Sequence, residues 1–233
     1  MRLAALELPA RFAGVAQQLA LVDELLAAPT DLALLPEASL TGYVSPQGDF
    51  DLARFAEPRD GPTARALADL AKRHRTRLVG PLVERAGNCL YNAMIGFDAD
   101  GREFLHYRKR HPWYPETWAT PGDAPHPVVE VEGLRVTIAL CFDIQFASEL
   151  PPHDVLLFPS AWVEKRDTRP ALLRALGTHV VNANWGVGEP RVAGQGNSCI
   201  LHASGEVLAR GGPRLDAVLT ASTDRADRKS RPQ

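Results

Sequence analysis

The sequence predicts an α/β protein in which β-α units alternate with β-hairpins. Residues 2–8 alternate weakly in polarity and residues 12–27 place apolar side chains at helical spacing, so the chain opens with a β-α unit. Residues 77–84, 90–98 and 103–107 are instead three strand-like stretches separated by tight turns. Because helical crossovers join parallel strands and tight turns join antiparallel ones, we expect mixed sheets.

The second predicted strand, residues 31–35, ends directly before Glu37. It stops at Pro36, which cannot donate a sheet hydrogen bond. Ligands of α/β sheets bind beyond the carboxyl ends of strands, so Glu37 is a candidate site residue. Residues 44–61 form a polar loop long enough to suggest a function, and residues 62–74 form a helix with proline in its first turn.

An irregular segment follows the third of the hairpin strands. Residues 111–123 are rich in proline and tryptophan and cannot form a regular helix or strand, so we expect an ordered site loop. Residues 128–132 and 134–140 read as a hairpin across Gly133, and its second strand leads to Cys141.

The rest of the chain continues the alternation. After a short irregular or helical piece at residues 144–150, we expect a strand at residues 155–158, a helix at 169–176 and a strand at 179–184. A hairpin of residues 198–202 with 206–209 and a final strand at 215–220 follow. Residues 222–233 are basic and carry little apolar surface, so we predict a frayed tail after a single domain at residues 1–221.

The composition excludes several classes of function. The chain has 233 residues, of which 45% are hydrophobic and 23% charged, with a net charge of −2, which is typical of a globular protein without a bias towards nucleic acid or anionic membranes. No apolar stretch approaches the length of about 20 residues that a membrane helix needs. We therefore expect a small-molecule partner, no nucleic acid and no membrane.

The cysteines and the N-terminus indicate the compartment. The three cysteines are an odd number, and the first residues lack the cationic and apolar regions of a signal peptide, so we expect a cytoplasmic protein. No Cys/His cluster has zinc-ligand spacing, so we expect no metal and no cofactor.

Cys141 is the candidate nucleophile. A strand end holds a side chain on a rigid scaffold while the group faces the loops. A single cysteine taken alone is more often a buried structural residue. The residues that accompany Cys141 in the sequence decide between these interpretations.

A set of short motifs is spread in order across nearly the whole chain. The main ones are Leu35-Pro36-Glu37, Thr41-Gly42-Tyr43, Tyr107-Arg108-Lys109 and Leu140-Cys141-Phe142-Asp143. Supporting pieces are Gly80 and Glu84 before Tyr91-Asn92, Pro159-Ser160-Ala161-Trp162, Arg174-Ala175, Asn184, Gly196-Asn197-Ser198 and Ser204-Gly205-Glu206. This ordered set resembles the nitrilase, or carbon–nitrogen hydrolase, superfamily, and the resemblance implies a four-layer α-β-β-α sandwich with two mixed β-sheets.

The resemblance also implies roles for individual residues. Glu37 is similar to the family's general base, which the chemistry requires because a thiol of pKa about 8.5 is mostly protonated at neutral pH. Lys109, one of only four lysines beside twenty-two arginines, resembles the lysine that stabilises the oxyanion together with the Phe142 N–H. Glu116 resembles the second glutamate, and its surroundings are similar to those of the amidase-like branch. We expect the side-chain ends of Glu37, Lys109 and Cys141 to converge within hydrogen-bond reach or one water.

The expected substrate-binding residues are Tyr43, Trp113, Phe142 and Trp162. Trp162 is equally well interpreted as a core aromatic, as is Trp185.

Some titratable residues have other interpretations. Glu84 is expected to be a structural acid. His106, His111 and His126 lie near the Lys109 loop and would fit a Cys–His dyad, but none occupies a position that the family pattern uses.

We therefore predict a cysteine-dependent carbon–nitrogen hydrolase that cleaves a non-peptide C–N bond of a small linear amide or N-carbamoyl compound through a thioester. The alternatives are a nitrilase that acts on a small nitrile, with the same residues, and a catalytically silent scaffold. The segment after Asp143 is several residues shorter than the family usually has, which predicts a truncated helix there. The resemblance also implies a homodimer that buries one helical layer.

Overall fold

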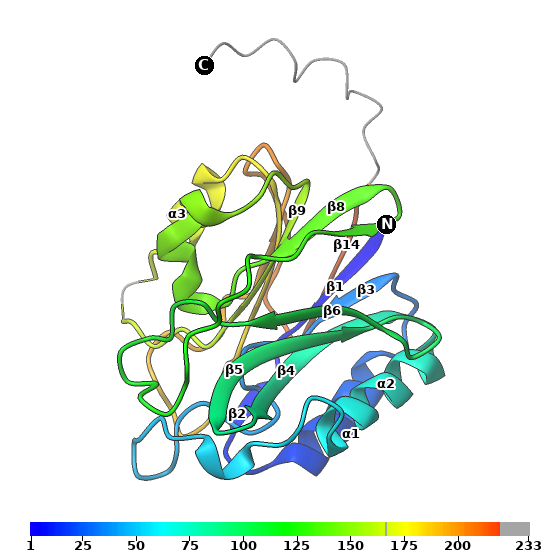
Figure 1. The fold of residues 1–233 in the computed structure, drawn as a ribbon. Coiled ribbons are helices and arrows are strands. Elements are labelled where there is room, and N and C mark those ends of the chain that lie inside the picture. The colour runs from blue at the N-terminus through cyan, green and yellow to red at the C-terminus, as the bar shows by residue number, and fades with distance from the viewer. Residues whose placement is uncertain (166, 220–233) are drawn as a thin grey trace.

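The computed structural model describes residues 1–165 and 167–219. Two six-stranded sheets pack face to face and helices cover their outer faces, so the chain forms an α-β-β-α sandwich (Figure 1). Both sheets combine parallel and antiparallel pairs. The predicted α/β class with mixed sheets is thereby confirmed. Within the described residues, no helix combines the length and the apolar character needed to span a bilayer.

The first sheet contains the β-α units of the N-terminal half. Its strands lie in the order β14-β1-β3-β4-β5-β6, with bounds Arg214–Val218, Arg2–Leu6, Leu32–Leu34, Arg77–Ala86, Cys89–Phe97 and Glu103–Arg108. Strands β1, β3 and β4 are parallel, whereas β4, β5 and β6 form the predicted antiparallel meander.

The second sheet carries the strand that precedes Cys141. Its order is β13-β12-β10-β9-β8-β7, with bounds Val207–Arg210, Cys199–Leu201, His179–Asn184, Val155–Ser160, Leu134–Ile138 and Val129–Val131. The central strands β8, β9 and β10 run parallel, so their carboxyl ends meet at one edge of the sheet. This is the edge at which α/β sheets bind ligands.

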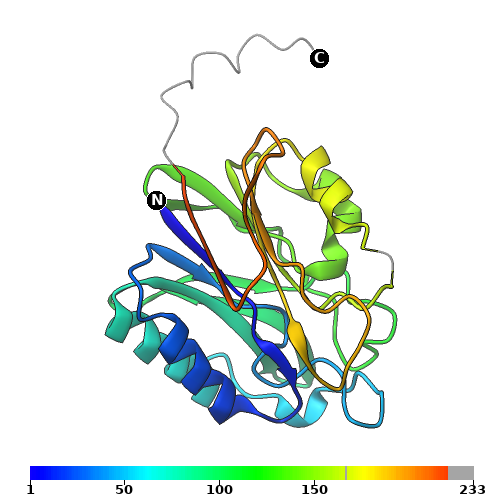
Figure 2. The same cartoon turned by 180° about the vertical axis from the view of Figure 1, so that it is seen from behind.

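Helices α1 (Val15–Leu25) and α2 (Pro62–His74) cover the first sheet, and α3 (Arg169–Ala175) covers the second, on the opposite side of the molecule (Figure 2). Apolar spacing explains this placement, because Val22 of α1 and Leu67 of α2 are fully buried in a cluster with side chains of β1 and β3. A separate apolar core fills the space between the sheets.

The structure differs from the predicted elements in a few places. A small parallel pair, β2 (Pro9–Arg11) with β11 (Gly186–Glu189), was not predicted. Strand β8 ends at Ile138 rather than at residue 140. The segment after the cysteine instead agrees with the prediction of a short, truncated helical piece, because residues Cys141–Glu149 form two short 3-10 turns that meet at Phe146 and no long helix follows. The predicted tail at residues 222–233 lies outside the described residues.

Candidate active site

Glu37 lies beyond the carboxyl end of β3 and has no solvent exposure. The next residue, Ala38, has a φ of 47°, a left-handed conformation that costs a residue with a Cβ about 1–2 kcal/mol. This turn directs the Glu37 carboxylate across to the second sheet, where its Oε2 accepts a hydrogen bond from the Ala161 N–H at 3.0 Å. Because Ala161 directly follows β9, one carboxylate joins the strand ends of both sheets.

Lys109 directly follows β6, and its backbone is fixed on both sides. Its N–H donates to the carbonyl of Asn92 and its own carbonyl accepts from the N–H of Gly122, each at 2.8 Å. The side chain has no solvent exposure. Its Nζ donates to Oε1 of Glu37 and to Oε1 of Glu116, both at 2.7 Å. One ammonium therefore joins two buried carboxylates.

Glu116 is held by more donors than Lys109 alone. The Tyr43 hydroxyl donates to Oε1 at 2.5 Å, and the Trp113 N–H donates to Oε2 at 3.3 Å. Asn92 donates its side-chain amide to Oε1 of Glu37 at 2.9 Å and to Oε2 of Glu116 at 3.4 Å. These donors fix both carboxylates relative to the ammonium.

Cys141 is the first residue of the turn after β8 and has a φ of 49°, in the left-handed region. Asp143 stabilises this strained turn, because its Oδ2 accepts from the Leu140 N–H at 3.1 Å and from the Tyr107 hydroxyl at 2.7 Å. Its Oδ1 accepts from the His111 N–H at 2.9 Å. One carboxylate thus connects the cysteine turn to β6 and to the loop that follows Lys109.

The electrostatics of this cluster keep the thiol protonated at rest. Burial raises the pKa of the Cys141 thiol, and the neighbouring Glu37 carboxylate raises it further, while Lys109 opposes both. Burial also raises the pKa of Glu37, against the effects of Lys109 and of a hydrogen bond with the Cys141 thiol. Burial alone would lower the pKa of Lys109, but the two carboxylates outweigh it and raise that pKa, so the lysine stays charged. The cluster therefore pairs a proton-holding thiol with a carboxylate of raised proton affinity.

A pocket opens on the nucleophile side of this cluster. Counting the part open to solvent, its empty volume is about 370 Å³, and its lining is Tyr43, Trp113, Cys141, Phe142, Gln145, Ala161, Trp162, Val163 and Glu164. All four residues predicted to bind substrate lie in this lining together with Cys141. The structure thus brings Glu37, Lys109, Glu116 and Cys141 into one cluster that adjoins one aromatic pocket.

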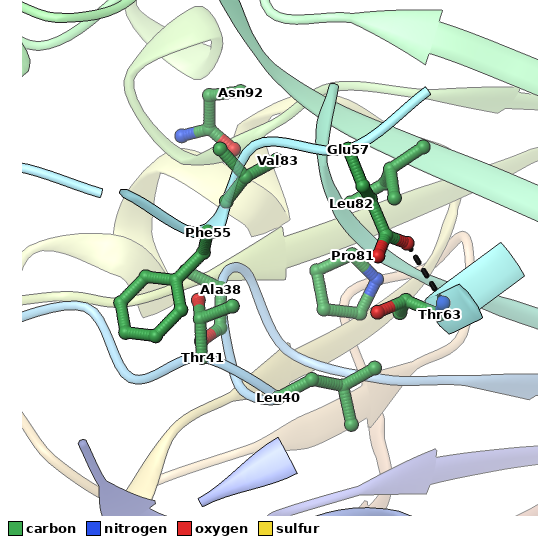
Figure 3. A pocket seen from close by; sticks show the side chains of 10 residues that line it. All are labelled: Ala38, Leu40, Thr41, Phe55, Glu57, Thr63, Pro81, Leu82, Val83 and Asn92. Atoms are coloured by element: carbon green, nitrogen blue, oxygen red, sulfur yellow. Dashed lines mark hydrogen bonds between the residues drawn. The ribbon is translucent and has the colours of Figure 1, made fainter. Parts of the chain in front are cut away.

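A second, tighter pocket lies between the loop after β3, the segment before α2 and strand β4 (Figure 3). Glu57 accepts a hydrogen bond from the Thr63 N–H at 2.7 Å within it. It shares Asn92 with the cluster, but Cys141 is not part of its lining. Of these two pockets, the aromatic one is therefore the one that can bring an electrophile to the thiol.

The three histidines near the lysine loop have other partners. The imidazole of His106 bonds Glu84 at 2.7 Å, that of His111 bonds Glu149 at 3.1 Å, and that of His126 bonds the Ile138 carbonyl at 2.8 Å. The structure therefore gives no support to the Cys–His dyad considered above.

Two further residues behave as structural groups. Burial alone would raise the pKa of Glu84, but hydrogen bonds from His106 and Arg108 lower that pKa to about 2. Trp185 is buried, and its indole N–H donates to the Trp162 carbonyl at 2.8 Å behind the pocket. Among the described residues, no group of three or more His, Cys, Asp and Glu side chains is arranged as a metal site.

Sequence reasoning gave no role to Asn92, Asp143 or the backbone N–H of Ala161. All three belong to motifs quoted for the family resemblance, which is the signal that could have identified them. Their contacts depend on tertiary structure, because Ala161 lies 124 residues from Glu37 and Asn92 lies 55 residues from it.

The sequence matches known proteins over most of its length. The family model described as carbon-nitrogen hydrolase matches residues 2–233. A relative named as a hydrolase in the pqqF 5' region of Pseudomonas protegens is 29% identical, over 96% of this chain and 82% of the relative. An N-carbamoylputrescine amidase from Solanum lycopersicum is 27% identical, over 72% of this chain and 67% of that enzyme.

The fold also matches solved structures. A point mutant of an amidase of the nitrilase superfamily from Nesterenkonia has a TM-score of 0.85 and 23% identity, covering 95% of this chain and 92% of that one. A carbon–nitrogen hydrolase superfamily protein from Xanthomonas campestris has a TM-score of 0.81 and 23% identity, covering 95% and 91%.

Proposed function

This chain belongs to the carbon–nitrogen hydrolase family, and from that premise we propose that it is a cysteine-dependent, amidase-like enzyme acting on a small linear amide or N-carbamoyl compound. The chemistry would pass through a thioester acyl-enzyme on Cys141. Glu37, Lys109 and Glu116 would complete the catalytic group, and Tyr43, Trp113, Phe142 and Trp162 would contact the substrate.

The observation that supports this proposal most strongly is the position of Lys109. A lysine with no solvent exposure between two carboxylates costs several kcal/mol of desolvation for each ion. Hydrophobic residues of similar volume would often be neutral or stabilising in such a place, so stability alone does not require these charges. The charges lie beside a thiol that reaches a pocket, which is where an acyl-transfer site needs them.

In the first step, Glu37 would take the proton of the Cys141 thiol as the sulfur attacks the carbonyl carbon. The raised pKa values of both groups suit this transfer, because the thiol keeps its proton until the substrate arrives and the carboxylate accepts it readily. The electron pair of the carbonyl bond moves to oxygen. Lys109 and the N–H of Phe142 would stabilise that oxyanion.

In the second step, the oxyanion collapses and the C–N bond breaks. Glu37 would return its proton to the leaving nitrogen, which departs as ammonia or an amine, and a thioester remains on Cys141. Glu37 would then deprotonate a water that attacks the thioester carbon. The acid leaves, the sulfur recovers its proton, and the site returns to its starting state.

Glu116 would hold the ammonium of Lys109 rather than react. Its four donors leave little freedom to its carboxylate, and Lys109 therefore has a fixed anionic partner in addition to Glu37. A fixed donor stabilises a transition state without the cost of reorganising.

The setting of the enzyme is also part of this proposal. The enzyme would be cytoplasmic, with residues 1–221 forming one domain, and it would be a homodimer as the family resemblance implies. No metal or cofactor takes part in the steps written here.

A substrate panel tests the proposed function. Purified protein would be incubated with short amides, ω-amides of dicarboxylic acids, N-carbamoyl amino acids and amines, and short nitriles, and the ammonia released would be measured. We expect release from at least one amide or N-carbamoyl compound, and none with Cys141→Ala. Release from nitriles alone would replace the amidase by a nitrilase, and release that persists in Cys141→Ala would overturn the proposal.

A further inference from the structure

We infer that the substrate carries a positively charged ammonium group at the end remote from the scissile bond, and that Glu164 recognises it. The inference rests on the proposed function and narrows its substrate class. It follows from the side chains and charges around the pocket that opens on Cys141.

Four of the nine residues that line this pocket are aromatic. Tyr43 and Trp162 are buried, while Trp113 and Phe142 are partly exposed. Aromatic rings attract cations through the negative potential of their faces. The same rings would attract a carboxylate of the substrate only weakly, because only their edges could contact it favourably.

Glu164 adds a formal negative charge to this lining. It is exposed, and none of the ion pairs formed among the described residues includes it. A carboxylate without a partner beside aromatic walls is a suitable end for a chain that terminates in an ammonium.

No described residue of the lining carries a positive charge. Lys109, which is buried deeper, is already shared between two carboxylates, so that cluster adds no positive potential. Lys165 is exposed and lies outside the lining.

Several charged groups on the neighbouring elements are paired, because Arg110 and His111 bond Glu149 and Arg169 bonds Asp167. Arg191, on the loop that packs against residues 162–164, is exposed and belongs to none of the ion pairs among the described residues, but it lies outside the lining. Within the lining, a substrate that ends in a carboxylate would thus meet Glu164 and no described cation.

Three probes of equal chain length separate the possibilities. The probes 5-aminopentanamide, hexanamide and adipamic acid have the same four-methylene chain and end in an ammonium, a methyl and a carboxylate. At pH 7 the amine of 5-aminopentanamide is protonated and the carboxylic acid of adipamic acid is deprotonated. We expect kcat/KM to decrease in the order ammonium, methyl, carboxylate.

Variants of Glu164 assign the preference to this residue. We expect Glu164→Gln to lower the ratio of kcat/KM between 5-aminopentanamide and hexanamide about fivefold, the effect of an exposed charge pair near the upper end of its usual range. We expect Glu164→Lys to reverse the order of the ammonium and carboxylate probes. Glu206→Lys is the matched control, because Glu206 is an exposed glutamate in the β12–β13 turn, which pairs with the amino-terminal end of β10, away from the pocket.

Calorimetry with Cys141→Ala protein separates failure of this inference from failure of the proposed function. Selective binding of 5-aminopentanamide to Cys141→Ala, lost in Cys141→Ala/Glu164→Gln, would support the inference. This holds even if the parent protein hydrolyses no probe, because the absence of hydrolysis would count against the proposed function alone. Hydrolysis of hexanamide with no preference for the ammonium probe would overturn the inference and leave the function standing. Equal loss of preference in Glu206→Lys, or no selective binding in calorimetry, would also overturn it.

Discussion

The side chain of Lys109 determines the charge balance of the site. It is fully buried, and its position between Glu37 and Glu116 leaves two carboxylates without a counter-charge if it is removed. Loss of one partner of a buried ion pair is far more costly than the net value of the pair, because the remaining charge stays desolvated.

Lys109→Ala is therefore expected to affect both catalysis and stability. We predict that kcat/KM falls by about 10²–10³-fold, the usual effect of removing one oxyanion donor. We also predict that the free energy of unfolding falls by about 3 kcal/mol. Steady-state kinetics and urea unfolding measure the two effects, and Lys72→Ala, at an exposed position of α2, is the control. Activity within threefold of the parent protein would remove Lys109 from the mechanism.

At this scale the sequence predicted residue types better than conformations. Glu37, Lys109, Glu116 and Cys141 were identified from motifs, and the structure brings them into one cluster. The left-handed backbone of Cys141 could not be predicted, because a cysteine at a positive φ has no local sequence signature. Tertiary contacts such as those of Asp143 hold it in that conformation.

At the scale of elements, Glu84 joins the strands that lead to Lys109. It lies on β4, and it bonds His106 and Arg108 of β6 across the intervening strand β5. Its side chain is 1% exposed, so these bonds are made in a poorly solvated place. This cluster fixes β6 one residue before the lysine.

Glu84→Gln is expected to destabilise the fold in a pH-dependent way. The pKa of Glu84 is lowered from 4.5 to about 2 in the folded protein, so its contribution is fully present above the unfolded-state value and is lost as the pH falls from 4.5 towards 2. At pH 7 we predict a loss of unfolding free energy on the order of 3 kcal/mol.

Urea unfolding of parent and variant at pH 7 and at pH 3 measures this difference. Glu132→Gln, which breaks an exposed pair with Arg77, is the control and should change little. A loss that is equal at the two pH values would show that the lowered pKa of Glu84 is not its cause.

The elements with strong local signals were the ones that could be predicted. The meander β4-β5-β6 follows from its tight turns and apolar runs, and α2 from its helical spacing and first-turn proline. The β2–β11 pair could not be found, since it joins short segments far apart in the sequence that have no periodic pattern of their own. The strand ending at Ile138 was extended by two residues because Ala139 and Leu140 are apolar, but they belong to the turn that presents Cys141.

For the whole molecule, the order of motifs along the chain allowed the four-layer architecture to be expected, which no single element could do. The two sheets close over the site only because β3, β6, β8 and β9 all end at the same region. What the sequence could not supply is the set of contacts between the sheets, since the bond from Ala161 to Glu37 depends on how the layers pack.

The assembly is a prediction at the same scale. The family resemblance implies a homodimer that buries one helical layer, and in this chain Ile144 of the short segment Cys141–Glu149 packs in one apolar cluster with Leu173 of helix α3. We expect light scattering after size-exclusion chromatography to give the mass of two chains at micromolar concentration. A monodisperse species with the mass of one chain would contradict the dimer.

The central claim, that Cys141 is a nucleophile that forms a thioester, is tested most directly by trapping the acyl-enzyme. The protein would be mixed with an amide that it hydrolyses, quenched in acid within the first turnovers, and examined by intact-mass and peptide mass spectrometry. We predict an added mass equal to the acyl group on the peptide that contains Cys141, removable by hydroxylamine and absent from Cys141→Ala, which should keep its fold because only a small group is lost. An acyl group on another residue, or turnover by a folded Cys141→Ala protein, would contradict the account.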